Sequence, residues 1–339
     1  MTGKPFIIPV FIPHQGCPHQ CVFCNQKTIT GSTATFPDAE SLRKIVFDFL
    51  DFARAHRTNV QIAFYGGNFL GLKAERLCFL LNKATDLIHQ GAADSIRFST
   101  RPDTITDERL KMIAAYPIKI IELGAQSMDD SVLKKIKRGH SSRDTEKALK
   151  LLREHGYVAG LQLMVGLPDE DEASLLSTGR YIVNLHPDFV RIYPTVVLKE
   201  SLLARWYLEG RYFPLSIKEA VERVKILYRL FQENDIPVIR MGLQASEDLD
   251  AGDRIVAGPY HPSFGELVYS ALFFDKAKKM LENSKPLPDT ITLKVNPRSL
   301  SKMRGHKNRN MIKLKAEFRA IAIDLVCDSS LSEDTVEMV

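Results

Sequence analysis

Short apolar runs alternate with longer segments of helical periodicity over the first 195 residues of the chain. Apolar residues recur at the spacing of one helix face in residues 42–53 and 77–87. The short runs are rich in β-branched and aromatic residues, which is typical of buried strands, and they cover residues 6–12, 60–65, 95–99, 119–123, 161–165 and 189–193. This alternation predicts six βα units around a parallel sheet. Functional sites of such folds form at the carboxyl ends of the strands, so the turns after these runs should converge.

After residue 195 the pattern changes to long helices and short strands. Residues 217–234 and 264–281 have helical periodicity, and a short strand is expected near Val238. Beyond a break at 285–288, the pattern predicts a strand at 290–295, mostly helix at 298–318 with a turn at Gly305, and a strand at 320–326. Residues 328–339 carry four acids and no base and should form a frayed tail.

The predicted fold class is therefore α/β: a partial (βα)6 TIM-like barrel, a C-terminal helical extension and a small α+β (βαβ) appendage. We expect the barrel in residues 1–210, an extension that closes it in 211–284, the small basic unit in 285–328 and the tail in 329–339.

The composition, 45% apolar and 26% charged in 339 residues, is that of a globular protein. No run of 18 uncharged apolar residues and no signal peptide is present. We therefore expect a cytoplasmic protein without a membrane partner.

Three of the five cysteines lie within eight positions of the loop after the first predicted strand. Cys17, Cys21 and Cys24 have the spacing C-x3-C-x2-C, which can direct three thiolates at one metal centre. An ordinary electron-transfer cluster needs four thiolates, so three indicate either a missing ligand or an iron left open for a substrate. A zinc site completed by His14 or His19 is an alternative. The other two, Cys78 and Cys327, lie in apolar segments and should pack in the core.

Several segments resemble one known family when they are taken in order. They are Cys17-Pro-His-Gln-Cys-Val-Phe-Cys24, Thr-Arg-Pro-Asp at 100–103, Glu-Leu-Gly-Ala-Gln-Ser at 122–127, Lys-Arg-Gly-His at 137–140 and Arg-Ile-Tyr-Pro-Thr at 191–195. Together they resemble the radical S-adenosylmethionine (radical SAM) superfamily. The similarity is to the radical SAM domain of the elongator catalytic subunit and, more distantly, to oxygen-independent coproporphyrinogen oxidase. It covers about residues 6–200 and does not extend to an acetyltransferase domain.

The resemblance implies an enzyme in which Cys17, Cys21 and Cys24 hold three irons of a 4Fe-4S cluster and SAM chelates the fourth. One electron, from a donor such as flavodoxin or ferredoxin, would then cleave SAM reductively to a 5′-deoxyadenosyl radical. The implied substrate is RNA, for example tRNA, or an RNA-bound group. A radical SAM enzyme for a small molecule, and a non-catalytic iron–sulfur or zinc module that binds RNA, are the alternatives.

Residues near the strand ends are the candidates for SAM and substrate. Gly66 and Gly67 would let the backbone approach the methionine amino group, and Arg138 could pair with its carboxylate. The resemblance and the positions together give this set for SAM: Phe23, Gly66, Gly67, Asn68, Thr100, Arg101, Gln126, Ser127, Arg138, Gln162 and Gly166. The superfamily more often has Glu or Thr where this chain has Asn68. Candidates that could face the substrate are Arg191, Tyr193, Gln244 and His261.

The net charge of +5 is unevenly distributed along the chain. Residues 294–319 contain nine Lys and Arg against one acid, a net +8, which leaves −3 for the remainder. Such a concentration is typical of a surface that contacts phosphates. The turn at 304–308 resembles the Gly-rich loop of KH-type RNA-binding folds, although the second glycine is missing. We expect RNA contacts from Lys302, Arg304, Lys307, Arg309 and Lys313; an exposed basic helix without a partner is the alternative.

Overall fold

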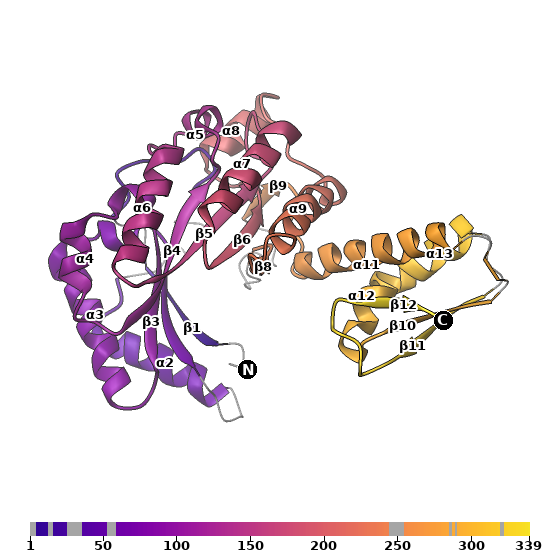
Figure 1. Cartoon of the computed structure of the whole chain (residues 1–339). Coiled ribbons are helices and arrows are strands. Elements are labelled where there is room, and N and C mark those ends of the chain that lie inside the picture. The colour runs from indigo at the N-terminus through magenta and orange to yellow at the C-terminus, as the bar shows by residue number, and fades with distance from the viewer. Residues whose placement is uncertain are drawn as a thin grey trace.

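A parallel sheet of seven strands, curled into a partial barrel, forms the larger part of the molecule (Figure 1). The structure is a computed structural model, which describes residues 5–12, 16–25, 36–52, 59–243, 254–284, 287–288, 290–318 and 322–339. The strand order is β1-β2-β3-β4-β5-β6-β8. The bounds are β1 Phe6–Phe11, β2 Val60–Tyr65, β3 Ser95–Thr100, β4 Ile118–Gln126, β5 Val158–Val165, β6 Phe189–Pro194 and β8 Val238–Met241.

This architecture confirms the predicted α/β partial barrel, with one more strand than the six repeats. The short strand expected near Val238 is β8, which extends the sheet by pairing in parallel with β6. A separate pair of short antiparallel strands, β7 Val197–Leu198 and β9 Ile255–Ala257, lies beyond β6 in the sequence.

Helices between the strands cover the outer face of the sheet (Figure 1). They are α2 Ala39–Phe52, α3 Ala74–His89, α4 Asp107–Ile113, α6 Ser142–Glu154, α7 Glu172–Leu185 and α9 Ile217–Gln232, with short 3₁₀ turns η1 Phe69–Gly71 and η2 Pro102–Thr104. Two further helices, α5 Asp130–Lys135 and α8 Leu202–Leu208, pack instead in a separate apolar cluster with Val22 and Leu167. Side-chain caps fix where several of them begin. Ser141 and Ser216, for example, each form a reciprocal capping box with the acid three residues later.

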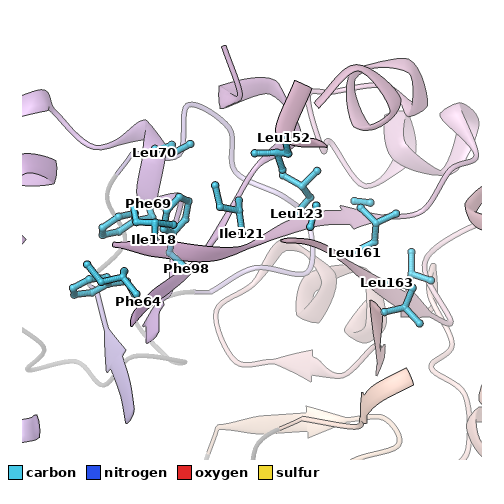
Figure 2. Close-up of a cluster of buried hydrophobic side chains, with 14 of the residues drawn as sticks. Phe64, Phe69, Leu70, Phe98, Ile118, Ile121, Leu123, Leu152, Leu161 and Leu163 are labelled. Carbon is cyan, nitrogen blue, oxygen red and sulfur yellow. The ribbon is translucent and has the colours of Figure 1, made fainter. Parts of the chain in front are cut away.

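The main core lies between these helices and the sheet, and Figure 2 shows part of it. Phe64 stacks on Phe69 with ring centroids 4.8 Å apart, and Phe98 lies 4.7 Å from Phe69. Leu123 and Leu161 continue the same layer along β4 and β5 and are fully buried. Each such side chain contributes about 1.5–3 kcal/mol on burial, so this layer holds the strand ends in fixed positions.

A second, smaller core lies in the C-terminal unit. Its elements are β10 Thr290–Val295, η3 Pro297–Ser299, α12 Leu300–Arg304, η4 His306–Asn308, α13 Arg309–Phe318, β11 Ala322–Cys327 and β12 Val336–Met338. The sheet order is β11-β10-β12, with β10 and β11 parallel. The long helix α11, Phe264–Asn283, joins this unit to the barrel (Figure 1).

Helix α11 contributes to both cores. Phe264 and Val268 pack in the barrel core, whereas Ala277 and Leu281 pack in the small one. The division that we predicted at residue 284 is a proposal for the domain boundary, and the helix before it is shared.

Two expectations for the C-terminal region are wrong. The predicted frayed tail instead forms β12, which pairs antiparallel with β10, because Val336 and Met338 alternate toward the small core. Cys327 is exposed at the end of β11 rather than packed in the core. Among the described residues, no helix is both long and apolar enough to cross a membrane.

Candidate functional site

The carboxyl ends of the barrel strands surround a cavity of about 320 Å³. The cysteine loop, the end of β2, the ends of β3 and β4, and inward residues of β5 and β6 all line it. Thirteen of the predicted site residues lie on its wall: Cys17, Cys21, Phe23, Cys24, Gly66, Gly67, Thr100, Arg101, Gln126, Arg138, Gln162, Arg191 and Tyr193. The structure therefore brings together residues that are up to 176 positions apart in the sequence.

The cysteine loop is fastened to the barrel through Val22, which is fully buried. Its amide donates to the carbonyl of Ile136 at 3.0 Å, and its carbonyl accepts from the amide of Leu203 at 2.8 Å. Cys21, beside it, is 4% exposed and accepts a hydrogen bond from Arg138 Nη1 at 3.4 Å. The loop therefore has a fixed course at its central cysteine and directly after it.

All three thiols line the cavity, but they are not drawn together into a ligand set: within the described residues, no three His, Cys, Asp or Glu side chains have the spacing of a metal site. Thiolates converge when a metal supplies the opposing charge. Burial raises the pKa of the Cys17 thiol, and the charges of Arg138 and Arg101 offset part of that rise. His19 also lines the cavity, while His14 lies outside the described residues.

Asn68 holds the cysteine loop rather than lining the cavity, contrary to its predicted contact with SAM. Its Nδ2 donates to the carbonyl of Gly16 at 2.8 Å. Its Oδ1 accepts from Thr100 Oγ1 at 2.6 Å and from the amide of Arg101 at 3.0 Å. The approach needs glycine at position 16, because φ is +79° there and a Cβ would lie 2.5 Å from the carbonyl oxygen of Asn68. This short, fully buried amide ties the loop to β3.

Two arginines beside the cysteines keep buried donors without partners. Arg101 donates to both oxygens of Asp103, at 2.8 and 3.0 Å, and to the carbonyl of Arg138 at 2.6 Å. Arg138 donates to the carbonyl of Gly124 at 2.6 Å. Among the described residues, Arg101 Nη1 and Arg138 Nε have no hydrogen-bond partner. A buried, unpartnered guanidinium N–H is costly unless an acceptor arrives, so this wall suits a carboxylate ligand.

A buried ion network forms the floor of the cavity around Glu122, which is 0% exposed. One carboxylate oxygen accepts from Arg97 at 3.0 and 2.5 Å and from the Tyr65 hydroxyl at 3.2 Å. The other accepts from Arg191 at 2.5 Å and from Gln162 at 2.8 Å. Burial raises the pKa of Glu122, but the charges of Arg191 and Arg97 outweigh it and hold this pKa below its ordinary value.

Family models match most of the barrel and its extension. The Radical SAM superfamily model matches residues 11–182, and the Radical_SAM C-terminal domain model matches 187–273. The chain belongs to the radical SAM superfamily. The resemblance inferred from the motifs is thereby confirmed.

Two curated relatives show what this radical SAM protein is similar to. A "tRNA uridine(34) acetyltransferase" of Methanocaldococcus infernus is 24% identical, over 78% of this chain and 55% of the relative. Elongator complex protein 3 of Drosophila melanogaster is 25% identical, over 72% and 53%. The chain thus spans about half the length of these curated relatives. A solved structure of the Methanocaldococcus infernus Elp3 has the same fold, with TM-score 0.64 and 22% identity over 82% of this chain and 64% of that one.

Radical SAM enzymes use a 4Fe-4S cluster and SAM, and this chain is an enzyme of that superfamily. The cavity fits both groups in the donors that it offers. Three thiols lie on one wall, and unpartnered guanidinium N–H groups lie next to them. Gly124 keeps the space open, because a Cβ there would lie 2.8 Å from Gln126 Nε2 and 2.9 Å from Arg138 Nη2.

Besides Asn68, four predicted site residues lie elsewhere or outside the described residues. Ser127 is buried, lies 3.2 Å from the hydroxyl of Thr178 and accepts from the amide of Asp129 at 3.1 Å. Gly166 lines a second cavity of about 240 Å³. His261 Nδ1 accepts from the amide of Ser263 at 3.1 Å and is not part of the cavity wall. Gln244 lies outside the described residues.

The sequence analysis did not find the role of Glu122, which entered only as part of a motif. The signal was present, since Glu122, Arg97 and Arg191 are charged residues flanked on both sides by apolar residues within three predicted strands. Buried charges of opposite sign on neighbouring parallel strands have to pair. His140, whose pKa burial and the nearby Arg138 and Arg101 charges lower to about 3, was likewise quoted only as part of a motif.

Proposed function

We propose that this radical SAM enzyme acts on RNA, with tRNA as the favoured class, or on a group carried by RNA. The observation that supports this most is the combination of the relatives' names with an excess of buried positive charge at the inner end of the cavity. The proposal assigns no product, because neither the names nor the cavity specifies one.

The cofactor wall is assigned from the contacts described above. Cys17, Cys21 and Cys24 would hold the cluster. Arg138 and Arg101 would offer their free N–H groups to the methionine carboxylate of SAM, because charge-assisted bonds satisfy such donors best. The cluster and SAM together supply a one-electron cleavage of SAM, which gives a radical able to abstract hydrogen.

The remaining cofactor contacts would come from backbone and amide groups. Gly66 and Gly67, with φ of 92° and 56°, bring the backbone to the cavity wall at the end of β2. Gln126 and Gln162 place amides on the same wall, where ribose hydroxyls would give them partners. The walls would also exclude water from the reacting centre.

The substrate end of the cavity carries more positive charge than its acid neutralises. Arg191 and Arg240 both line it, and Arg97 lies beneath it, around the single carboxylate of Glu122. Arg191 is 8% exposed, and its Nε has no partner within the described residues. Among the described residues, Arg240 donates to the carbonyls of Gly242 and Leu243 at 3.2 and 3.4 Å. Two buried guanidiniums, Arg97 and Arg191, share the one carboxylate of Glu122, and the half-buried Arg240 adds a third positive charge. This excess favours an anionic substrate group, and the phosphodiesters of RNA provide one.

The enzyme also needs a low-potential reductant for its cluster. A small acidic carrier such as flavodoxin or ferredoxin is the proposed donor. Its docking site is not part of the proposal.

The test is anaerobic reconstitution of the full chain with iron and sulfide, followed by chemical reduction in the presence of SAM. Methionine and 5′-deoxyadenosine are measured with total cellular RNA, with the same RNA after nuclease treatment, and without RNA. We expect 5′-deoxyadenosine in all samples and stimulation only by intact RNA. No 5′-deoxyadenosine from a loaded cluster would refute the radical chemistry in this chain, while equal stimulation by nuclease-treated RNA would favour a small-molecule substrate.

Cysteine variants test the metal wall separately. Cys17→Ala, Cys21→Ala and Cys24→Ala should each lose the cluster's visible absorption and all 5′-deoxyadenosine formation. Cys327→Ala is the matched control, because that thiol is exposed in the small unit, and it should retain both. Retention of the cluster in all three loop variants would contradict the assignment.

A further inference from the structure

The helical turn of the C-terminal unit carries a basic surface that the proposed function does not yet use. We define this basic turn surface as Arg304, Lys307, Arg309 and Lys313, all exposed, on α12, η4 and α13. The family models end at residue 273, so the surface lies outside both of them.

The acidic side chains of the small unit form ion pairs with bases that lie outside the basic turn surface. Asp328 pairs with Lys294 at 3.8 Å, and Glu333 pairs with Arg298 at 2.7 Å, both at the β10–β12 side. Glu317, at the end of α13, pairs with Lys278 of α11. Residues 302–315 contain six bases and no acid, and the ion pairs formed within the described part of the chain include none of the basic turn surface. The acidic tail therefore sharpens the charge contrast between the two sides of the unit.

The turn that carries these bases is held rigidly against α11. Asn310 donates to the backbone carbonyl and the hydroxyl of Ser270, at 2.8 and 3.0 Å, and to the carbonyl of Lys302 at 3.3 Å. Gly305 has a φ of +70°, and a Cβ there would lie 2.7 Å from Ser270 Oγ. Only glycine permits this approach. A preformed turn loses little entropy when it binds a ligand.

The backbone conformation at Asn308 shows how the turn forms without the second glycine of the KH-type loop. Gly305-His306-Lys307-Asn308 joins two helices, and these lie between the parallel strands β10 and β11 in the order strand, helix, helix, strand. Asn308 occupies the fourth position with φ of 60°, in the left-handed region that Asn tolerates better than most residues. In KH-type units a turn of this kind clamps the nucleic-acid backbone. Asn308 can supply here the conformation that a glycine would supply.

The side chains around the turn favour a nucleic-acid strand over a membrane. Ile312, 60% exposed on α13, is the large apolar side chain that accompanies the basic turn surface. Lys302 lies over the ring of Tyr269 at 4.8 Å, and Lys313 lies over that of Phe274 at 5.7 Å, so these aromatic faces are covered by cations. A membrane-binding face needs a wide apolar stripe next to its bases, and a phosphate backbone needs mainly the bases.

We propose that the turn 305–308 and the basic turn surface bind the phosphate backbone of a single-stranded RNA segment. The identification of the bound strand with the enzyme's substrate rests on the proposed function, but the binding itself does not. The site is separate from the cavity of the barrel, because it belongs to the second core and is connected to the first through α11.

The test compares two double variants of the full chain that have the same net charge. Lys307→Asp with Arg309→Glu reverses two bases of the surface, and both changes suit the backbone: Asp tolerates the φ of 52° at position 307, and Glu is favourable at the start of α13. Lys44→Glu with Lys218→Glu is the matched control, on exposed positions of α2 and α9 in the barrel. Fluorescence anisotropy measures binding of a labelled 12-nucleotide RNA, of duplex RNA and of anionic lipid vesicles over a salt series.

We expect the turn variant to bind single-stranded RNA about tenfold more weakly or worse at 0.1 M salt. The slope of log affinity against log salt should fall by about 1.4, because each of two lost phosphate contacts contributes about 0.7 on single strands. The control should bind like the original protein. Equal weakening in both variants would show that net charge alone acts and would overturn the proposal, as would a preference for vesicles or for duplex RNA.

Cleavage of SAM separates this proposal from the proposed function. Without RNA, the turn variant should form 5′-deoxyadenosine at the original rate, because none of its changes touches the cavity. If the turn variant binds RNA normally and RNA still stimulates its cleavage of SAM, the docking surface is refuted and the proposed function stands. If the turn of the original protein binds RNA but RNA does not stimulate its cleavage of SAM, RNA is refuted as the substrate and the docking surface stands.

Discussion

Replacement of Glu122 by glutamine tests whether the ion network holds the barrel floor. The carboxylate serves two guanidiniums through its two oxygens, Arg97 on one and Arg191 on the other. An amide keeps one acceptor and turns its NH2 group toward the other arginine, so one buried guanidinium loses its partner in either rotamer. Breaking one side of a buried pair costs about 3–5 kcal/mol, and we expect Glu122→Gln to lower the free energy of unfolding by that amount.

Urea unfolding of the iron-free full chain at pH 7 measures this loss. Fluorescence of Trp206, the single tryptophan, reports on the barrel, because its indole packs with Val22 and Leu203. Glu146→Gln makes the same chemical change at an exposed glutamate on α6 whose carboxylate accepts from the Tyr181 hydroxyl, and it should cost less than about 1 kcal/mol. A loss below about 1 kcal/mol for Glu122→Gln as well would refute the reasoning.

The pH dependence of the stability difference between the original protein and Glu122→Gln tests whether Glu122 is charged in the folded chain. The pKa of Glu122 in the folded chain is below its ordinary value, so its contribution to stability is present above the unfolded pKa of about 4.3 and is lost as pH falls through the folded pKa. The difference between the original protein and Glu122→Gln should therefore be constant near neutral pH and shrink in acid below about pH 4. A difference that grows as pH falls would contradict the assignment of a charged Glu122.

Two further variants test other buried contacts. Asn68→Ala should lower the free energy of unfolding by about 2–3 kcal/mol, because it leaves the carbonyl of Gly16 and the amide of Arg101 without partners. It should also speed the loss of iron to a chelator, although the cysteines remain. Iron retention equal to that of the original protein would show that Asn68 does not position the cysteine loop. The Glu170→Gln variant should become more stable relative to the original protein as pH rises from 5 to 8, by up to about 3 kcal/mol. The reason is that burial raises the pKa of Glu170 in the folded chain to about 7, so its charged form destabilises the fold. A stability difference that stays constant over this pH range in urea unfolding would exclude a raised pKa at Glu170.

The strands were predictable because each lies in a short run rich in apolar and β-branched residues. The prediction for 60–65 coincides with β2, Val60–Tyr65, and that for 189–193 is one residue shorter than β6, Phe189–Pro194. Strands of a parallel sheet that is covered by helices are mostly apolar, so they stand out from the polar turns that follow them. Since every predicted strand ended within three residues of the observed end, the convergence of most candidate residues on one cavity followed from the topology.

The roles of individual polar side chains could not be read from position alone. Asn68 and Gly67 are neighbours at the end of β2, but Gly67 lines the cavity and Asn68 turns back to hold Gly16. A hydrogen bond across 52 residues depends on where the loop lies, which no local pattern encodes. β12 was missed for a related reason: its two inward apolar residues stand in a segment dominated by acids.

The positive charges of the barrel cavity and of the basic turn surface differ in how much free energy their burial requires. In the barrel, Arg101, Arg138 and Arg191 are buried with donors unpartnered, an arrangement that is favourable only when an anion is bound. In the small unit, Lys307 and Arg309 are exposed and keep their hydration, so they attract a polyanion at little cost. One continuous helix, α11, packs in both cores. In our proposal, an RNA strand held at the small unit has a high effective concentration at the barrel, and only a substrate long enough to reach both sites can use it, which favours a polymer over a free metabolite.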